Sequence, residues 1–156
     1  MAITANRLSG ASFDQDAFGQ FAAGLRGDTF QPGDAGYDGA RALYNGMIDK
    51  RPALIVQVAD IADVIATVNF AREQGADLAV RGGGHNGPGL ASVDDGIVLD
   101  LRRLNSVRVD PVARTARVEG GAVWSDVDHA THAFGLAVPS GTVASTGVAG
   151  LTLGGG

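Results

Sequence analysis

The sequence predicts an α+β (α/β) fold with two lobes, a small parallel βαβ lobe followed by a mainly antiparallel α+β lobe. Two strand-like runs, 52–58 and 78–81, flank a segment over 60–74 whose apolar residues recur at helical spacing. A strand, a helix and a strand of this length form a crossover that leaves the two strands parallel. From residue 96 onward, short alternating runs indicate strands with one solvated face. The two lobes are expected to meet near glycine-rich turns.

Boundary residues define the elements of the first lobe. The N-terminal segment, 1–45, has weaker signals and is expected to be partly helical, with a helix over 12–25. Pro52 bounds the first strand. Asp60 is a good N-cap for the helix that follows, and Gly75 is well placed to end that helix.

The second lobe is expected to begin with a strand and a hairpin and to continue with a helix. In chain order its elements are a strand at 96–100, a hairpin of 107–109 and 115–118 around Asp110–Pro111, a helix at 123–133 ended by Gly135, and a strand at 136–138. Leu151–Leu153 are expected to form another apolar strand that leads into three glycines. Such an ending is typical of a ligand-facing turn cut off midway, so we expect the chain to be a fragment truncated at its C-terminus.

Composition excludes several classes of function. The chain has 156 residues, a formal net charge of −5 and no cysteine. It therefore lacks the basic footprint of nucleic-acid binding, and it has no disulfide, thiolate metal site or cysteine nucleophile. No apolar run approaches the roughly 20 residues that span a bilayer, and the first ten residues lack the apolar core of a signal peptide. We expect a cytoplasmic protein with no membrane partner, and the sequence leaves the oligomeric state open.

A glycine turn with a histidine at its end is the strongest functional signal. Arg81, Gly82, Gly83, Gly84, His85 and Asn86 directly follow a predicted strand. Consecutive glycines let the backbone lie close to another group, and their amides can form an anion-binding nest. An imidazole that has lost its proton supplies a nucleophilic nitrogen. The turn therefore predicts a cofactor site with His85 at its rim.

A second region of small residues lies near the C-terminal end. It offers hydroxyls and backbone amides that suit close approach by a phosphate or a flat polar ring. Its candidate residues are Ser140, Gly141, Thr142, Gly147 and Val148. An ordinary turn-rich connection is the alternative, but two such regions on one short chain favour a shared site.

Other chemistries find less support. Residues 82–87 match Gly-x-Gly-x-x-Gly, but Pro88 and Gly89 follow and no helical pattern begins there, as a nicotinamide-dinucleotide site requires. His129 and His132 lie three residues apart on a predicted helix, which could hold a metal ion, but a solvated polar face is the simpler interpretation. We therefore expect no metal site.

Six segments in a fixed order carry a resemblance to a known family. They are Arg51–Val56, Val80–Asn86, Gly96–Leu101, Gly120–Trp124, Gly135–Gly141 and Gly147–Gly156. Together they resemble the FAD-binding domain of the vanillyl-alcohol-oxidase superfamily, also called the PCMH type. Within it they are most similar to berberine-bridge-enzyme-like flavoproteins and bacterial hydroxynicotine oxidases. The resemblance implies an incomplete FAD-binding domain over 46–156, with FAD between the two lobes.

The resemblance also implies roles for particular residues. Arg81 and the three glycines after it match the turn that cradles the diphosphate, and His85 matches the histidine that bonds covalently to the flavin. Some relatives have a second tether, a cysteine at the position of Val143, so a single link is expected here. The catalytic base cannot be named, because Tyr37 and Tyr44 do not match it.

The implied activity is that of an FAD-dependent oxidoreductase. In such an enzyme a hydride passes from an alcohol or amine carbon of a small-molecule substrate to the flavin, and molecular oxygen is the expected electron acceptor. Three alternatives remain open at this stage: a flavin-binding fragment without turnover, an NAD(P)-dependent dehydrogenase, and a structural or interaction domain.

Overall fold

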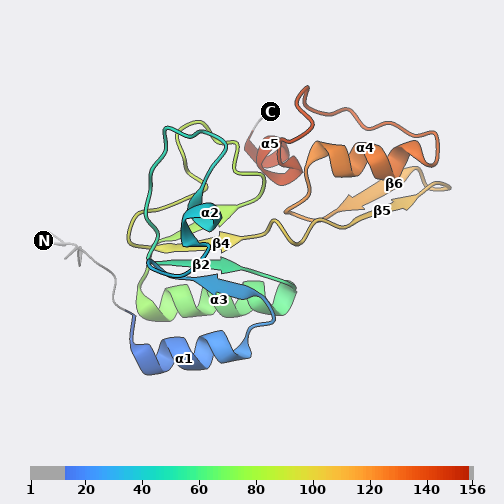
Figure 1. Ribbon diagram of the computed structural model, residues 1–156. Coiled ribbons are helices and arrows are strands. Elements are labelled where there is room, and N and C mark those ends of the chain that lie inside the picture. The colour runs from blue at the N-terminus through green and yellow to red at the C-terminus, as the bar shows by residue number, and fades with distance from the viewer. Residues whose placement is uncertain (1–12, 155–156) are drawn as a thin grey trace, which may run out of the picture.

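A four-stranded sheet forms the centre of the first lobe (Figure 1). The structure, a computed structural model, describes residues 13–154. The strand order is β1 (Asp28–Phe30), β2 (Leu54–Gln57), β4 (Ile97–Asp100) and β3 (Leu78–Arg81). β4 lies between β2 and β3 and pairs with both in parallel, and β1 adds an antiparallel edge. The predicted parallel βαβ unit is confirmed, with β4 inserted between its two strands.

Helices cover both faces of this sheet. α3 (Ile61–Gln74) packs on one face with α1 (Gln15–Gly24) beside it, and α2 (Tyr37–Arg41) lies on the other face. The predicted boundaries of α3 are confirmed. The Asp60 side chain caps its first turn, and Gly75 ends it in the left-handed conformation with φ +63°.

Alternating side chains of the sheet make two apolar layers. Leu54, Val56 and Leu99 pack against Phe70 of α3, and the core they form extends to α1. Ile55, Val98 and Ala79 point to the opposite face, where Tyr37 and Ala40 of α2 cover them. The inner strands β2 and β4 are buried on both faces, and all their residues except the last of each are apolar, as expected of a parallel sheet.

The second lobe differs from the sequence prediction in two places. β5 (Val107–Asp110) and β6 (Thr115–Val118) form the predicted hairpin, and α4 (Trp124–His132) packs against it. Residues 136–138 are not a strand, because the N–H of Leu136 donates to Thr131 at the end of α4 and, within residues 13–154, they are paired with no strand. The apolar run before the last glycines is also not a strand but part of a short helix, α5 (Val148–Gly154).

Some expectations fall partly or wholly outside the described residues. Ser12, at the start of the predicted N-terminal helix, lies outside them, as do Gly155 and Gly156 of the final glycine run. Among residues 13–154, each helix is too short or too polar to cross a bilayer.

Asp63 ties the start of α3 to two other segments. Its buried carboxylate accepts hydrogen bonds from the backbone N–H groups of Arg26 (3.0 Å), Gly27 (2.9 Å) and Ala59 (2.8 Å). Burial alone would raise the pKa of Asp63, but these N–H donors outweigh burial and hold its pKa below the ordinary value. The charged form is therefore the one that stabilises the native state.

Asp63→Asn should lower the free energy of unfolding at pH 7 by about 2 kcal/mol, because one amide cannot satisfy three buried N–H donors. The native pKa lies below the unfolded one, so the carboxylate's contribution is complete above the ordinary value of about 4. The stability that the carboxylate contributes is lost as the pH falls through the native pKa of Asp63. Urea unfolding at pH 7 and pH 3 should show the variant's deficit shrink at the lower pH. Asp128→Asn, at an exposed position of α4, is the control and should show no such change.

Candidate functional site

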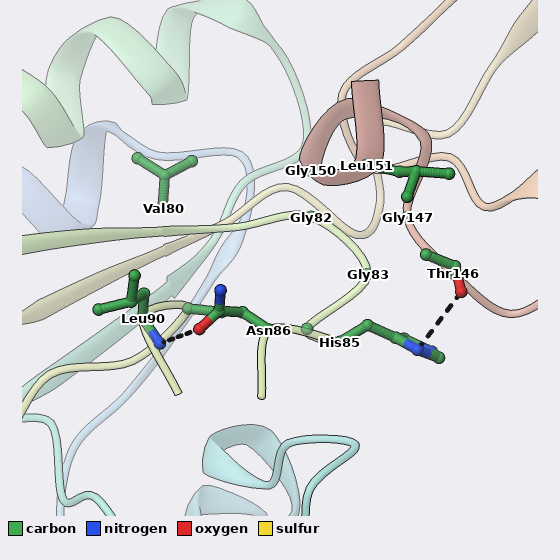
Figure 2. A pocket seen from close by; sticks show the side chains of 12 residues that line it. Val80, Gly82, Gly83, His85, Asn86, Leu90, Thr146, Gly147, Gly150 and Leu151 are labelled. Carbon is green, nitrogen blue, oxygen red and sulfur yellow. Dashed lines mark hydrogen bonds between the residues drawn. The ribbon is translucent and has the colours of Figure 1, made fainter. Parts of the chain in front are cut away.

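A cavity of about 320 Å³ lies where the glycine turn after β3 meets the start of α5 (Figure 2). One wall is the turn itself, and the other is the segment that leads into α5. The lining residues are Val80, Gly82, Gly83, Gly84, His85, Asn86, Leu90, Ala91, Thr146, Gly147, Gly150 and Leu151. Residues from the two glycine-rich regions therefore share one site, although they are far apart in the sequence.

The two walls touch backbone to backbone, which requires glycine on both sides. A Cβ atom added to Gly83 would lie 2.4 Å from the Gly147 nitrogen, and one added to Gly147 would lie 2.4 Å from the Gly83 nitrogen. Hydrogen bonds fix the second wall to the second lobe: Trp124 N–H donates to Thr146 (3.1 Å), and Val148 N–H donates to Ala122 (2.9 Å). The cavity is thus bounded by main chain held at a fixed separation.

His85 stands at the rim of the cavity and is half-buried. Its imidazole points toward the second wall, where Thr146 Oγ1 lies 3.5 Å from Nδ1 (Figure 2). Ser145 Oγ lies 3.2 Å from Nε2. The ring of Tyr44 stacks on the imidazole with centroids 3.9 Å apart and planes inclined by 17°.

Arg81 supports the site from behind, because its side chain faces away from the cavity. Its guanidinium is 1% exposed and donates to the carbonyl groups of Ala40 (2.5 Å) and Ala91 (3.2 Å). Burial lowers the pKa of Arg81 below its ordinary value, and the fully buried Asp100 carboxylate, 3.8 Å away, opposes that change. Arg81 therefore anchors the loops around the turn instead of offering a charge to a ligand.

Asn86 lines the cavity and also shapes the loop. Its side-chain oxygen accepts a hydrogen bond from Leu90 N–H at 2.9 Å (Figure 2). A side-chain bond of this kind closes a turn in the way that backbone bonds do elsewhere. Asn86 thus brings Leu90 to the cavity as part of its apolar lining.

The structure brings together only part of the second predicted set of residues. Gly147 lines the cavity, whereas Ser140, Gly141, Thr142 and Val148 are not among its lining residues. Ser140 and Thr142 are exposed, and Gly141 packs against Leu151 and Trp124.

Tyr44, Ser145 and Thr146 were not predicted from the sequence. Each reaches His85 through a contact between distant parts of the chain, so no local pattern marks it. A weak signal existed for Ser145 and Thr146, since both lie within the small-residue region before Gly147. Tyr44 lies beside Asn45, whose side chain donates to Gly87 at 3.0 Å, and nothing in the sequence points to that contact.

The geometry also bears on the two alternative sites. Residues 82–96 contain no helix, so the Gly-x-Gly-x-x-Gly match lacks the helix N-terminus that a nicotinamide-dinucleotide turn requires. His129 and His132 are exposed on α4, and within residues 13–154 no three histidine, aspartate or glutamate side chains are grouped to hold a metal ion.

Comparisons with known proteins agree with this arrangement. Residues 52–156 match the family described as FAD binding domain. (R)-6-Hydroxynicotine oxidase of Paenarthrobacter nicotinovorans is 38% identical over 132 residues, which make up 85% of this chain and 29% of that protein. An FAD-linked oxidoreductase of Dictyostelium discoideum is 38% identical over 139 residues, or 88% of this chain and 30% of that one.

Solved structures give the same result. 6-Hydroxy-D-nicotine oxidase from Arthrobacter nicotinovorans has a TM-score of 0.79 at 37% identity, covering 81% of this chain and 28% of that one. BBE-like 1 from Physcomitrella patens has a TM-score of 0.76 at 27% identity, covering 86% of this chain and 30% of that one. The chain thus spans less than a third of the length of these relatives. It belongs to the FAD binding domain family, and its fold is that of the PCMH-type flavoproteins that include hydroxynicotine oxidases and berberine-bridge-enzyme-like proteins.

Proposed function

We propose that this chain is the FAD-binding part of an FAD-dependent oxidoreductase and that it holds FAD covalently through His85. The observation that carries the proposal is the cavity itself, where two glycine walls meet backbone to backbone and an imidazole stands at the rim. A chain of the FAD binding domain family with this cavity has a place for a dinucleotide and a nucleophile beside it.

The residues present fit the group. Within the described part of the chain no lysine or arginine lines the cavity, so the charge of a diphosphate would be met by backbone N–H groups. Among residues 13–154, no protein group accepts a hydrogen bond from the N–H of Gly84 or His85, so these donors can meet a ligand. Val80, Leu90 and Leu151 add apolar surface of the kind that a flat ring covers.

The size of the cavity is consistent with part of the cofactor. About 320 Å³ lies at the small end of the roughly 300–1,000 Å³ typical of ligand sites, so a dinucleotide would extend beyond these walls. FAD bound there would supply two-electron oxidation of an alcohol or amine carbon, with molecular oxygen as the acceptor. The hydroxynicotine oxidases are named for a substrate that is an amine, so we favour an amine among the small-molecule substrates of this protein.

Each residue has a defined part in this proposal. His85 supplies the nitrogen for the covalent link, and the chain has no cysteine to form a second one. Gly83 and Gly84 line the cavity and would offer main chain to the diphosphate, and glycine at 83 is needed for the close contact with Gly147. Arg81 keeps the turn in place through its bonds to Ala40 and Ala91.

The attachment is tested by expressing the chain and precipitating it with acid. We expect flavin absorbance in the purified protein and a yellow pellet that keeps its colour. His85→Ala should release all of the flavin into the supernatant. His132→Ala, which removes an exposed histidine of α4, is the matched control and should keep the yellow pellet. A coloured pellet from His85→Ala would contradict the attachment site, and protein that stays colourless after FAD is added would contradict flavin binding altogether.

A further inference from the structure

The imidazole of His85 is held by side chains from two separate segments. Tyr44, in the loop between α2 and β2, stacks on one face of the ring at a centroid distance of 3.9 Å. Ser145 and Thr146, from the segment before α5, reach its two nitrogens at 3.2 Å and 3.5 Å. The stack fixes the plane of the ring, and the hydroxyls fix its rotation within that plane.

Burial does not explain the position of Tyr44. It is 69% exposed, so its ring gains little from leaving water where it lies. Its backbone is nevertheless fixed to the turn, because Tyr44 N–H donates to Gly84 at 3.4 Å and the neighbouring Asn45 side chain donates to Gly87 at 3.0 Å. The contact that its ring makes is the stack on His85, which orients the imidazole.

The two hydroxyl contacts are not equivalent. A neutral imidazole has one N–H that donates and one nitrogen that accepts. One of the two hydroxyls must therefore accept a hydrogen bond from the ring, and the other must donate one to it. The Ser145 contact to Nε2 is the shorter one, whereas the Thr146 contact to Nδ1 lies at the outer limit for a hydrogen bond. Thr146 lines the cavity and Ser145 does not, so the partner of Nδ1 belongs to the cavity wall and the partner of Nε2 lies outside it.

We infer that Tyr44 and Ser145 are positioning residues that hold His85 in one orientation and in one tautomer. Ser145 Oγ accepts a hydrogen bond from Nε2–H, which leaves Nδ1 unprotonated beside Thr146 in the cavity wall. Tyr44 prevents the ring from turning out of that plane. This inference rests on the proposed function, since the unprotonated nitrogen is the one able to bond to a carbon of the cofactor. The new N–C bond would replace a C–H bond of a flavin methyl group, with the proton released and the two electrons passed through the flavin to molecular oxygen.

The tautomer can be read directly in the chain without flavin. Nitrogen-15 spectra at a pH where imidazole is neutral should show His85 with its proton on Nε2. Ser145→Ala should give a mixture of both tautomers, and Ser145→Thr should restore the single form. Thr142→Ala, which removes an exposed hydroxyl of the same loop, is the control and should leave the spectrum unchanged. A tautomer mixture in the parent chain, or an unchanged spectrum in Ser145→Ala, would overturn the role of Ser145.

Tyr44 is tested by the rate at which added FAD becomes acid-stable. Tyr44→Phe keeps the stacked ring and should match the parent rate, because no contact of the Tyr44 hydroxyl is needed. Tyr44→Leu should slow the reaction about tenfold, which corresponds to the upper range of an aromatic pair's interaction. Equal rates for Tyr44→Leu and the parent would overturn the role of Tyr44. Thermal unfolding shows whether each variant folds. If Tyr44→Leu is misfolded, Tyr44→Met takes its place in the rate measurement.

Failure of the two proposals can be told apart. If the parent chain never forms acid-stable flavin, the covalent function is wrong, while the nitrogen-15 spectra still decide whether His85 has a fixed tautomer. If flavin attaches equally fast in the parent, Ser145→Ala and Tyr44→Leu, the covalent function stands and the positioning roles are wrong.

Discussion

Asp100→Ala should lower the free energy of unfolding by about 3–5 kcal/mol, the range for removing one partner of a buried ion pair. The Asp100 carboxylate is fully buried between two guanidinium groups, that of Arg81 at 3.8 Å and that of Arg102 at 2.6 Å. Arg102 is 38% exposed at its side chain and can turn toward water, but Arg81, at 1%, cannot. The variant therefore leaves a charge buried without its counterion.

Urea unfolding at pH 7 measures this loss, and two further variants locate its origin. Arg102→Ala should lower the free energy of unfolding much less than Asp100→Ala, because the Arg102 variant leaves Arg81 with its counterion. Arg81→Met combined with Asp100→Leu should recover only part of the loss, since the carbonyls of Ala40 and Ala91 lose their donor. Equal unfolding midpoints for Asp100→Ala and the parent would contradict this view of the ion pair.

Gly83→Ala should both destabilise the chain and abolish flavin retention. The added Cβ would lie 2.4 Å from the Gly147 nitrogen and 2.6 Å from its Cα, and neither backbone atom can move without displacing the segment that leads into α5. We expect a loss of about 3 kcal/mol, the upper end of the usual cost of overpacking. The cavity should open as the two walls separate, so the flavin absorbance of the purified protein should disappear.

Gly87→Ala is the matched control, because it lies in the same loop and its added Cβ meets nothing within 4 Å. Gly147→Ala should reproduce the effects of Gly83→Ala, since each glycine meets the backbone of the other. The double variant Gly83→Ala with Gly147→Ala should lose less unfolding free energy than the sum of the two single losses, as expected for residues that share one contact. Full flavin retention in Gly83→Ala would show that the walls are not held together as the structure has them.

The first lobe could be predicted because its signals are local. The predicted helix over 60–74 opens on a capping aspartate and has Gly75 after it, and the structure keeps both boundary signals. The predicted apolar stripe is wrong in part, because Ile61, Ile65 and Val68 are exposed and the buried face of α3 is carried by Thr67, Phe70 and Ala71 with Asp63. β1 (Asp28–Phe30) was not predicted, because a three-residue edge strand is too short to show alternation. The insertion of β4 between β2 and β3 depends on long-range pairing that the sequence does not display.

The C-terminal region was misread for a physical reason. Leu151–Leu153 is an apolar run too short for periodicity to distinguish strand from helix, and it forms part of α5. Residues 136–138 lie near the hairpin of β5 and β6 but do not pair with either of its strands, and pairing with a distant strand is not written in a three-residue apolar run.

The candidate site was predictable only where its chemistry lies within one stretch of sequence. The five residues Gly82–Asn86 directly follow a strand, and all five line the cavity. Arg81 belongs to the same stretch, but its side chain points the other way, because it ends a strand whose alternate residues face the interior. Ser145 reaches His85 across 60 positions of sequence, and only the folded chain reveals such a contact.

The meeting of the two glycine walls has a consequence for biosynthesis. Thr146 follows His85 by 61 positions, so a ribosome adds the second wall long after the histidine has been incorporated. A nascent chain that has reached only the histidine has just one of the two walls of the cavity. Under the proposed function, loading with flavin would therefore follow translation of Gly147, and polypeptides released before that point should neither retain nor attach the cofactor.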